Sequence, residues 1–221
     1  MSSCRAVKRI AHLIFSVIAL TACDVPLSRF GEPPASTRYS PQEGDILFQS
    51  LPHSPLVAAI EGVSGSPLSH CGVVTKSGNG WAVLEAIGPV QETALHKWIA
   101  RGRSSHFAAF RILPPYDAAI SLFLSSARAY LGRPYDNLYE LDDEKIYCSE
   151  LLYKAFWAAT GKPLGEAKPL GALNWQPHEE FIKQTTGGEL PLERIIITPV
   201  ALSEAPELRK IYEENTPDYS Q

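Results

Sequence analysis

The sequence predicts a single domain of the α+β class, containing both antiparallel strands and helices. A β-rich run at 69–75 turns at 77–80 and returns at 81–87, which is the pattern of a β-hairpin. Two apolar stripes with helical spacing follow, at 116–131 and 148–160. The hairpin requires antiparallel pairing, and each apolar stripe gives its helix a face for packing.

Shorter patterns predict the remaining elements. Apolar runs bounded by turn residues favour strands at 43–49, 106–112 and 193–198. After the hairpin, residues 89–100 are expected to form a strand and then a short helix. Other short helices are expected around 56–60, at 177–183 and, as a last polar helix, at 205–214.

The first 22 residues have the pattern of an export signal. A positive start with Arg5, Lys8 and Arg9 precedes an apolar core at 10–20, which is shorter than the roughly 20 residues of a membrane span. The core ends in Leu20-Thr21-Ala22-Cys23, which resembles the lipobox of bacterial lipoproteins. This resemblance implies cleavage before Cys23 and lipidation of its thiol. The alternative is an ordinary secretory signal followed by an incidental cysteine.

Such processing would define the organisation of the mature chain. The signal would end at residue 22, a lipidated Cys23 and flexible tether would occupy 23–42, and one compact domain would occupy 43–221. The product would be lipid-anchored in a bacterial cell envelope. Asp24 resembles the inner-membrane retention signal of enteric bacteria, so the periplasmic face of the inner membrane is one expected location.

The charge of the mature chain argues against a nucleic-acid partner. Removing residues 1–22 lowers Lys+Arg from 20 to 17 against 24 Asp+Glu, a formal charge of −7. Nucleic-acid-binding domains carry basic rather than acidic surfaces. The acidic stretch at 140–144 is read as a solvated loop, with attraction of a cationic substrate group as the alternative.

Cys148 is the residue most suited to chemistry, because it stands where the second apolar stripe begins. In the first turn of a helix, unpaired N–H groups and the positive end of the dipole favour a thiolate. The same N–H groups can stabilise an oxyanion formed by attack on a carbonyl. The alternative is a buried cysteine that acts only as a small apolar residue.

The predicted hairpin supplies two partners for that thiol. On its first strand His70 shares a face with Gly72 and Val74, and on its second strand Glu85 lies on an otherwise apolar face. If the two faces coincide, Glu85 lies close to His70. A buried carboxylate needs such a partner, whereas an edge-strand glutamate facing solvent does not. Together, His70, Glu85 and Cys148 would supply a base, a residue that orients it and a nucleophile.

Cys71 is expected to face away from His70, because successive strand residues alternate between faces, and therefore to belong to the core. For the same reason a metal site built from His70, Cys71, Glu85 and Cys148 is disfavoured. A disulfide between Cys71 and Cys148 is an alternative in an oxidising envelope. We expect both thiols to be free in active protein, since the disulfide would remove the thiolate.

Five short motifs, in order, resemble the permuted papain-like amidases of the YiiX kind, relatives of the NlpC-type cysteine hydrolases. They are Gly44-Asp-Ile-Leu47, Ser69-His-Cys-Gly-Val-Val74, Leu84-Glu-Ala-Ile-Gly-Pro89, Gly132-Arg-Pro-Tyr-Asp136 and Tyr147-Cys-Ser-Glu-Leu-Leu152. The resemblance implies a circularly permuted papain-like fold, an antiparallel sheet packed with helices, in which the histidine strand precedes the cysteine helix. It also implies Cys148 as nucleophile, His70 as base and Glu85 as the third polar member. Cys71 departs from the apolar residue expected after the histidine.

The expected function is therefore cleavage of an amide or peptide bond through an acyl-enzyme, without a cofactor. Cell-wall peptides and N-acyl amines are the substrate classes that the resemblance implies. Ser149, Tyr135 and Trp175 are candidate oxyanion or substrate contacts. The alternatives are acyl transfer from lipid to an amine through the same thioester, and a non-catalytic envelope lipoprotein that binds peptide or lipid.

Overall fold

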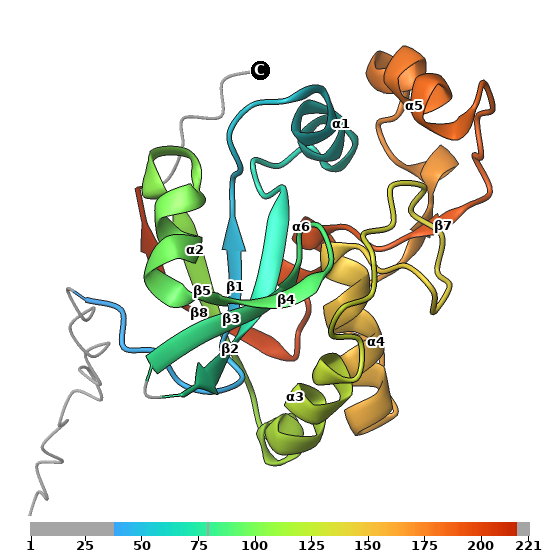
Figure 1. The fold of residues 1–221 in the computed structure, drawn as a ribbon. Helices are drawn as coiled ribbons and strands as arrows, with labels where there is room; N and C mark the ends of the chain where they lie inside the picture. Colours follow the sequence, from blue (N-terminus) through green and yellow to red (C-terminus); the bar gives the residue numbers. More distant parts are fainter. Residues whose placement is uncertain (1–37, 79, 216–221) are drawn as a thin grey trace, which may run out of the picture. The chain divides into compact units, whose positions relative to one another are not determined.

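A six-stranded antiparallel sheet organises the described part of the protein, residues 38–78 and 80–215 of a computed structural model (Figure 1). The strand order is β4-β3-β2-β1-β5-β8. The strands are β1 (Ile46–Gln49), β2 (His70–Ser77), β3 (Gly80–Ala86), β4 (Val90–Ala94), β5 (Phe107–Ile112) and β8 (Leu208–Glu214). The predicted signal at 1–22, Cys23 and Asp24 lie outside the described residues.

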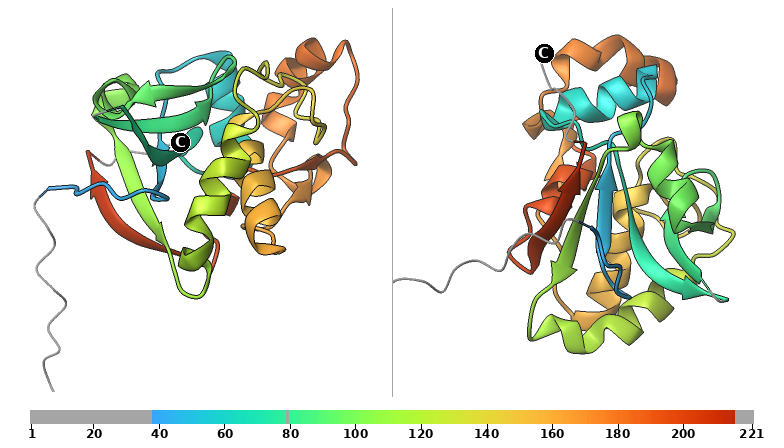
Figure 2. Two further views of the ribbon diagram at one scale, coloured as in Figure 1. Left: turned by 60° about the horizontal axis from the view of Figure 1, so that its bottom comes forward. Right: turned by 90° about the vertical axis from the view of Figure 1, so that its left-hand side faces the viewer.

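Helices cover both faces of the sheet. They are α1 (Pro55–Ser64), α2 (Leu95–Arg101), α3 (Ile120–Arg128), α4 (Cys148–Thr160), α5 (Glu179–Thr186) and α6 (Pro199–Ser203). α3 and α4 lie side by side, while α2 lies on the other side of the sheet (Figures 1 and 2). Among the described helices, none is long and apolar enough to cross a membrane.

Two apolar clusters follow from the alternation of side chains along the strands. Ile46, Phe48 and Val73 face α3 and α4 and pack with buried residues such as Phe123 and Phe156. On the other face, the alternate strand residues form a smaller cluster with Trp98 of α2, and these residues are Leu47, Val74, Val83, Phe107 and Ala109. The central strands are therefore buried on both faces, and any polar side chain there needs a partner.

The prediction of a last helix at 205–214 is wrong, because most of this segment forms the edge strand β8. β8 pairs with β5 from Phe107↔Glu214 to Ile112↔Leu208, with an irregularity between Ala109 and Phe110. Its charged side chains indicated a solvated helix, but charges are also typical of an exposed sheet edge. Pairing with the free edge of β5 decides the structure, and no local pattern contains that information.

The predicted strand at 193–198 is also shorter than expected. Only Ile195–Ile196 is assigned as a strand, β7, and it pairs with the two-residue strand β6 (Lys168–Pro169) outside the main sheet. The N–H of Ile197 donates instead to the Tyr147 hydroxyl at 3.1 Å. This side-chain contact diverts the segment from the sheet to the start of α4.

Candidate active site

Cys148 is the first residue of α4 and is only 2% exposed. The buried stripe predicted for this helix holds it against the sheet through Leu151, Leu152 and Ala155. Glu150 stabilises the first turn, because its Oε2 accepts from the N–H of Tyr147 at 3.1 Å. The remaining first-turn N–H groups have no carbonyl one turn earlier in the helix. The thiol thus lies at a fixed, electropositive helix start.

His70 begins β2, and Glu85 lies on the neighbouring strand β3. Both side chains are buried, and His70 Nε2 lies 2.5 Å from Glu85 Oε2. The expected coincidence of the two strand faces is confirmed. Gly72 makes it possible, since a Cβ there would lie 2.5 Å from Val83 Cγ1 and 3.2 Å from the Cβ of Glu85.

Two further residues bind Glu85. Thr93 on β4 donates its hydroxyl to Glu85 Oε1 at 2.6 Å, and Arg101, the last residue of α2, donates from Nη2 to Glu85 Oε2 at 2.5 Å. Neither residue was predicted from the sequence to belong to the site. Thr93 lies within the predicted strand and Arg101 directly follows the predicted helix, but nothing in either pattern indicates that they meet a carboxylate.

The ionisation of the three central groups is coupled. Burial alone would raise the pKa of Glu85, but His70 and Arg101 lower it to about 2. Burial alone would lower the pKa of His70, but Cys148 and Glu85 raise it to about 9. Interaction with Cys71 lowers the pKa of Cys148 well below its ordinary value against the effect of burial, and His70 lowers it further. This arrangement favours a thiolate beside an imidazolium.

Cys71 is a core residue, as predicted, with no exposed surface. Its face of β2 is the one that α4 covers, so the same core contains Cys148 and the two side chains interact. Both cysteines are free thiols. The strand alternation that turns Cys71 away from His70 was correctly predicted. The interaction of Cys71 with Cys148 was not, because it depends on where α4 packs against the sheet.

The three candidate contact residues have different positions. Tyr135 interacts with Cys148, and burial raises its pKa well above the ordinary value. The hydroxyl of Ser149 donates to the Ile197 carbonyl at 2.8 Å, which joins the start of α4 to a distant segment of the chain. Trp175 is half-buried and is absent from the linings of the two cavities described next.

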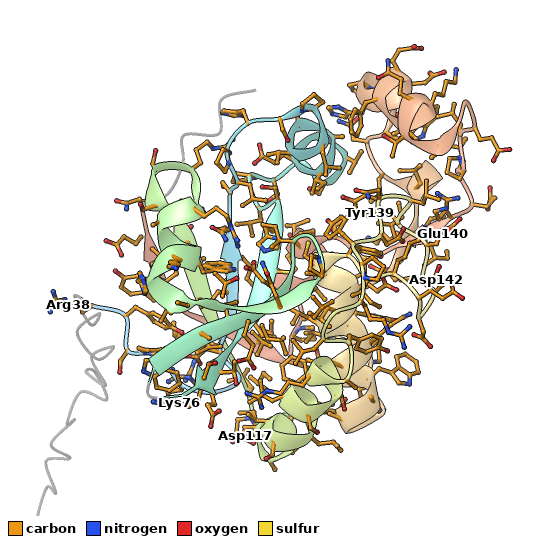
Figure 3. The ribbon with its side chains drawn as sticks, in the orientation of Figure 1. Arg38, Lys76, Asp117, Tyr139, Glu140 and Asp142 are labelled. Atoms are coloured by element: carbon orange, nitrogen blue, oxygen red, sulfur yellow. The ribbon has the colours of Figure 1, made fainter. Side chains whose placement is uncertain are left out.

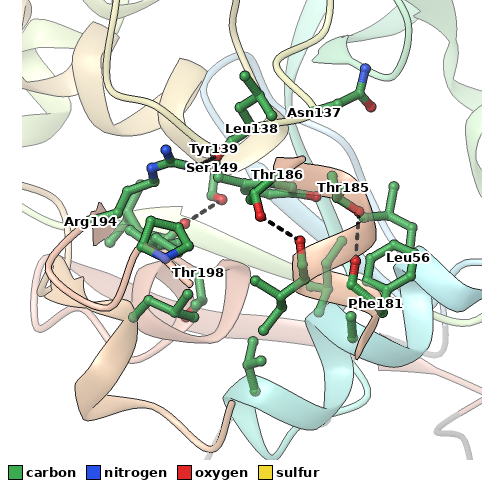
Figure 4. Close-up of a pocket in the computed structure, with 18 of the residues that line it drawn as sticks. Leu56, Asn137, Leu138, Tyr139, Ser149, Phe181, Thr185, Thr186, Arg194 and Thr198 are labelled. Atoms are coloured by element: carbon green, nitrogen blue, oxygen red, sulfur yellow. Dashed lines mark hydrogen bonds between the residues drawn. The ribbon is translucent and has the colours of Figure 1, made fainter. Parts of the chain in front are cut away.

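Two adjoining cavities meet at the site. The first, of about 90 Å³, has Cys148 in its wall and is otherwise mostly apolar. Ser149, in the same wall, is labelled in Figure 4. The second, of about 270 Å³, is bordered by His70 and Tyr135. Leu56, Ile60 and Asn137 line both cavities and therefore form the wall between them. The apolar wall of the first cavity includes Val63, Leu138, Leu170, Phe181, Ile182, Ile196 and Ile197.

The acidic stretch at 140–144 is largely satisfied within the chain, near Tyr139 and α4 (Figure 3). Glu140 lies 3.1 Å from Arg194, and Asp143 lies 2.8 Å from Lys154. Asp142 accepts from the N–H groups of Glu144 and Lys145, two and three residues further along the chain. These contacts favour the interpretation of a structural loop over that of a site for a cationic substrate group.

Comparison with known proteins identifies relatives in Escherichia coli. The chain is 31% identical over 183 residues to the uncharacterized protein YiiX of strain K12, with 80% of this chain and 88% of YiiX covered. It also matches the crystal structure of YiiX from strain O157:H7 with a TM-score of 0.74 and 32% identity, covering 80% of this chain and 99% of that one.

That crystal structure is described as one of a metalloprotein. In residues 38–78 and 80–215 of the present chain, no group of three or more His, Cys, Asp or Glu side chains is arranged to hold a metal ion. Glu85 is already bound by His70, Thr93 and a guanidinium, which is an unsuitable neighbour for a cation. The residues of this site therefore do not fit a metal.

The family comparison agrees with the arrangement of the strands and helices. Residues 40–212 match the profile of the permuted papain-like amidase enzymes of the YaeF/YiiX kind, the C92 family. The match includes the whole sheet except the end of β8, and both elements that carry His70 and Cys148. The chain belongs to the C92 family of permuted papain-like amidases, and its α+β fold is the circularly permuted papain-like fold of that family.

Proposed function

We propose that this protein is a cysteine amidase in which Cys148 is the nucleophile, His70 the general acid and base, and Glu85 the residue that orients His70. The observation that carries the proposal is the contact of buried His70 with Glu85 at 2.5 Å, together with the interaction of His70 with Cys148 at a helix start. In this setting each group has a role in acyl transfer that a purely structural core would not need.

The proposed reaction begins with a Cys148 thiolate and a His70 imidazolium. The sulfur attacks the amide carbonyl carbon, and the N–H groups at the start of α4 stabilise the oxyanion. Collapse of this intermediate breaks the C–N bond, and His70 gives its proton to the leaving amine. Because Nε2 contacts Glu85, Nδ1 is the ring nitrogen that exchanges the proton. His70 then takes a proton from water, which hydrolyses the thioester and restores the thiolate.

The cavities favour N-acyl amines over cell-wall peptides as substrates. The cavity beside Cys148 has an almost entirely apolar wall, which suits an alkyl or aromatic acyl group. Its cationic residue, Arg194, is engaged by the Leu138 carbonyl at 2.6 Å and by Glu140, so it is not available to bind a peptide carboxylate. The second cavity, bordered by His70 and Tyr135, would hold the leaving amine.

Analysis of the products formed from a panel of substrates tests both the proposed mechanism and the proposed substrate class. Purified protein would be incubated with N-acyl amines of increasing acyl length and with muropeptides, and the amine released would be quantified by mass spectrometry. We expect hydrolysis of the acyl amines, improving with acyl length, and its loss in Cys148→Ala. Full activity in Cys148→Ala would refute the mechanism, while a preference for muropeptides would refute the substrate class.

Acyl transfer to an amine is a second candidate, because Cys148 and His70 are each only 2% exposed. A nearly dry thioester favours an acceptor that binds in the adjoining cavity over bulk water. Adding a primary amine to the same assay would separate the two reactions. A new acyl amide formed at the expense of the free acid supports transfer, whereas unchanged release of the acid supports hydrolysis.

We also propose that the protein is anchored to a membrane through lipidated Cys23, as the lipobox-like sequence predicts. Labelling cells with a radioactive or clickable fatty acid tests this directly. The wild type is expected to be labelled and to fractionate with membranes, and Cys23→Ser to lose the label. A wild-type protein without label would contradict the anchor without affecting the proposed chemistry.

A further inference from the structure

We propose that Arg101 is a positioning residue of the site, which keeps Glu85 ionised and directed at His70; its role rests on the proposed cysteine chemistry. Arg101 Nη2 lies 2.5 Å from Glu85 Oε2, the same oxygen that lies 2.5 Å from His70 Nε2. Thr93 occupies the other oxygen at 2.6 Å. The carboxylate is thus fixed by three donors from three different elements.

The need for a permanent cation follows from the burial of Glu85. Its side chain has no exposed surface, and a carboxylate in such a place takes up a proton unless a charge compensates for the loss of water. His70 compensates only while it is an imidazolium. Once His70 has passed its proton to the leaving amine, the guanidinium of Arg101 is the positive charge that remains beside Glu85.

The consequence for the reaction is control over where the proton goes. At a 2.5 Å separation, the proton on His70 Nε2 has a nearby acceptor in Glu85. A second cation on the same oxygen makes that carboxylate a weaker base, so the proton stays on the imidazole and Nδ1 serves the thiol and the leaving group. Arg101 therefore acts on catalysis through Glu85, without touching the reacting atoms.

The fold delivers Arg101 by anchoring α2 on the sheet face that carries His70. Trp98 of α2 is fully buried, and its ring centroid lies 6.1 Å from that of His70. Gly102 ends the helix in a place where a Cβ would lie 2.6 Å from the His106 carbonyl oxygen. Arg101 is therefore held between a buried anchor and a close passage of the chain.

A second ion pair, which also joins a buried carboxylate to a partly exposed arginine, provides a matched control. Arg111 on β5 lies 2.8 Å from Asp45, and the exposures of the two side chains are 29% and 1%. The corresponding values for Arg101 and Glu85 are 27% and 0%. The Asp45 pair has the same chemistry and burial, and the described contacts of its carboxylate do not include a histidine. Arg111→Gln therefore measures the effect of losing a buried arginine–carboxylate pair that has no contact with His70.

The test is the pH dependence of Cys148 alkylation by iodoacetamide, quantified by mass spectrometry of the Cys148 peptide between pH 3 and 9. Wild type, Arg101→Gln, Arg101→Lys and Arg111→Gln would be compared after circular dichroism has confirmed folding. Because Arg101 depresses the pKa of Glu85, its loss lets Glu85 take a proton at higher pH, and His70 then loses its anionic partner. In Arg101→Gln we therefore expect the acid limb of the profile, the pH range in which alkylation falls as the pH is lowered, to shift to higher pH by about one unit or more.

We also expect Arg101→Lys to restore most of the wild-type profile and Arg111→Gln to match it. An unchanged limb in folded Arg101→Gln, or an equal shift in Arg111→Gln, would overturn the proposal. If Arg101→Gln does not fold, Thr93→Val should move the limb in the same direction by a smaller amount, and no movement would count against the carboxylate's role.

The same experiment distinguishes failure of the proposed function from failure of the proposed role of Arg101. Absence of labelling in folded wild-type protein at every pH would refute a reactive Cys148. Titration of His70 by ¹⁵N NMR would then still test Arg101, because a protonated Glu85 lowers the pKa of His70. A His70 titration that is the same in wild type and Arg101→Gln would overturn the positioning role.

Discussion

Cys71 on β2 interacts with Cys148 on α4, so two free thiols from opposite sides of a strand–helix interface share one buried site. The interaction with Cys71 is the largest influence that lowers the pKa of Cys148. Burial raises the pKa of Cys71 itself, so Cys71 remains a thiol and can donate to the Cys148 thiolate. The residue next to the histidine therefore contributes to the setting of the nucleophile from the other face of the strand.

Replacing Cys71 with alanine should make Cys148 less acidic. Because one donor to the thiolate is lost, we expect the pH at which alkylation is half-maximal to rise by about one unit, which corresponds to ~1.4 kcal/mol. Iodoacetamide labelling between pH 3 and 9 measures this shift. Cys71→Ser keeps a donor and should remain closer to wild type. Identical profiles for all three proteins would show that Cys71 serves packing alone.

The pH dependence of amide cleavage should have an alkaline limit near pH 9. His70 must be protonated to supply the leaving amine, and its pKa is raised to about 9, so this form persists below that pH and is lost above it. The lowered pKa of Cys148 keeps the thiolate present on the acid side. The pair titrates jointly, so the limits of kcat/KM against pH describe the pair and not one residue.

Glu85→Gln tests the origin of that alkaline limit. Glutamine removes the anion that helps to raise the pKa of His70, so the limit should move to lower pH, by about one to two units. The full profile of kcat/KM, recorded on protein shown to be folded by circular dichroism, gives the answer. A limit that stays near pH 9 would mean that Glu85 does not set the ionisation of His70.

The sequence predicted the parts of the site that depend on local rules. Strand alternation placed His70 and Glu85 on faces that can meet, and the start of an apolar stripe located Cys148 at the first turn of α4. The resemblance then related these positions to one family. Predictions for the strands and helices from 43 to 160 were confirmed in outline, because their periodicity is strong and their connections are short.

Predictions failed where tertiary pairing overrides local pattern. β8 carries charges that suit a helix, and it becomes a strand because β5 offers an unpaired edge. Arg101 and Thr93 were missed for a similar reason. Their contacts with Glu85 depend on the packing of α2 against β3 and on the pairing of β4 with β3. The bond from the Ser149 hydroxyl to the Ile197 carbonyl also joins segments that are distant in sequence. None of these contacts has a signature in the residues nearby.

The apolar cavity can be tested by two neighbouring residues of β7. Ile196 lines the cavity beside Cys148, whereas Ile195 is 43% exposed and is not among its lining residues. A charge in the cavity wall opposes binding of an apolar acyl chain, so Ile196→Glu should raise KM for long-chain acyl amines about tenfold or more. Ile195→Glu should leave KM unchanged. Equal effects of the two changes, or none, would contradict assignment of this cavity to the acyl group.

Tyr147 connects the position of Cys148 with the wall of that cavity. Its fully buried ring packs in the core, and its hydroxyl accepts from the Ile197 N–H at 3.1 Å, beside the Ser149 bond to the Ile197 carbonyl. Tyr147→Phe keeps the ring but leaves a buried N–H without its acceptor, which costs about 1–3 kcal/mol. We expect that loss in the free energy of unfolding measured with urea, together with a higher KM for acyl amines, because Ile197 lines the cavity.

Ser203→Ala is a suitable control for Tyr147→Phe, since it removes a hydroxyl bond to Val200 within α6, away from Cys148. If Tyr147→Phe lowered stability but left KM unchanged, the tie between α4 and Ile197 would support the fold without shaping the cavity.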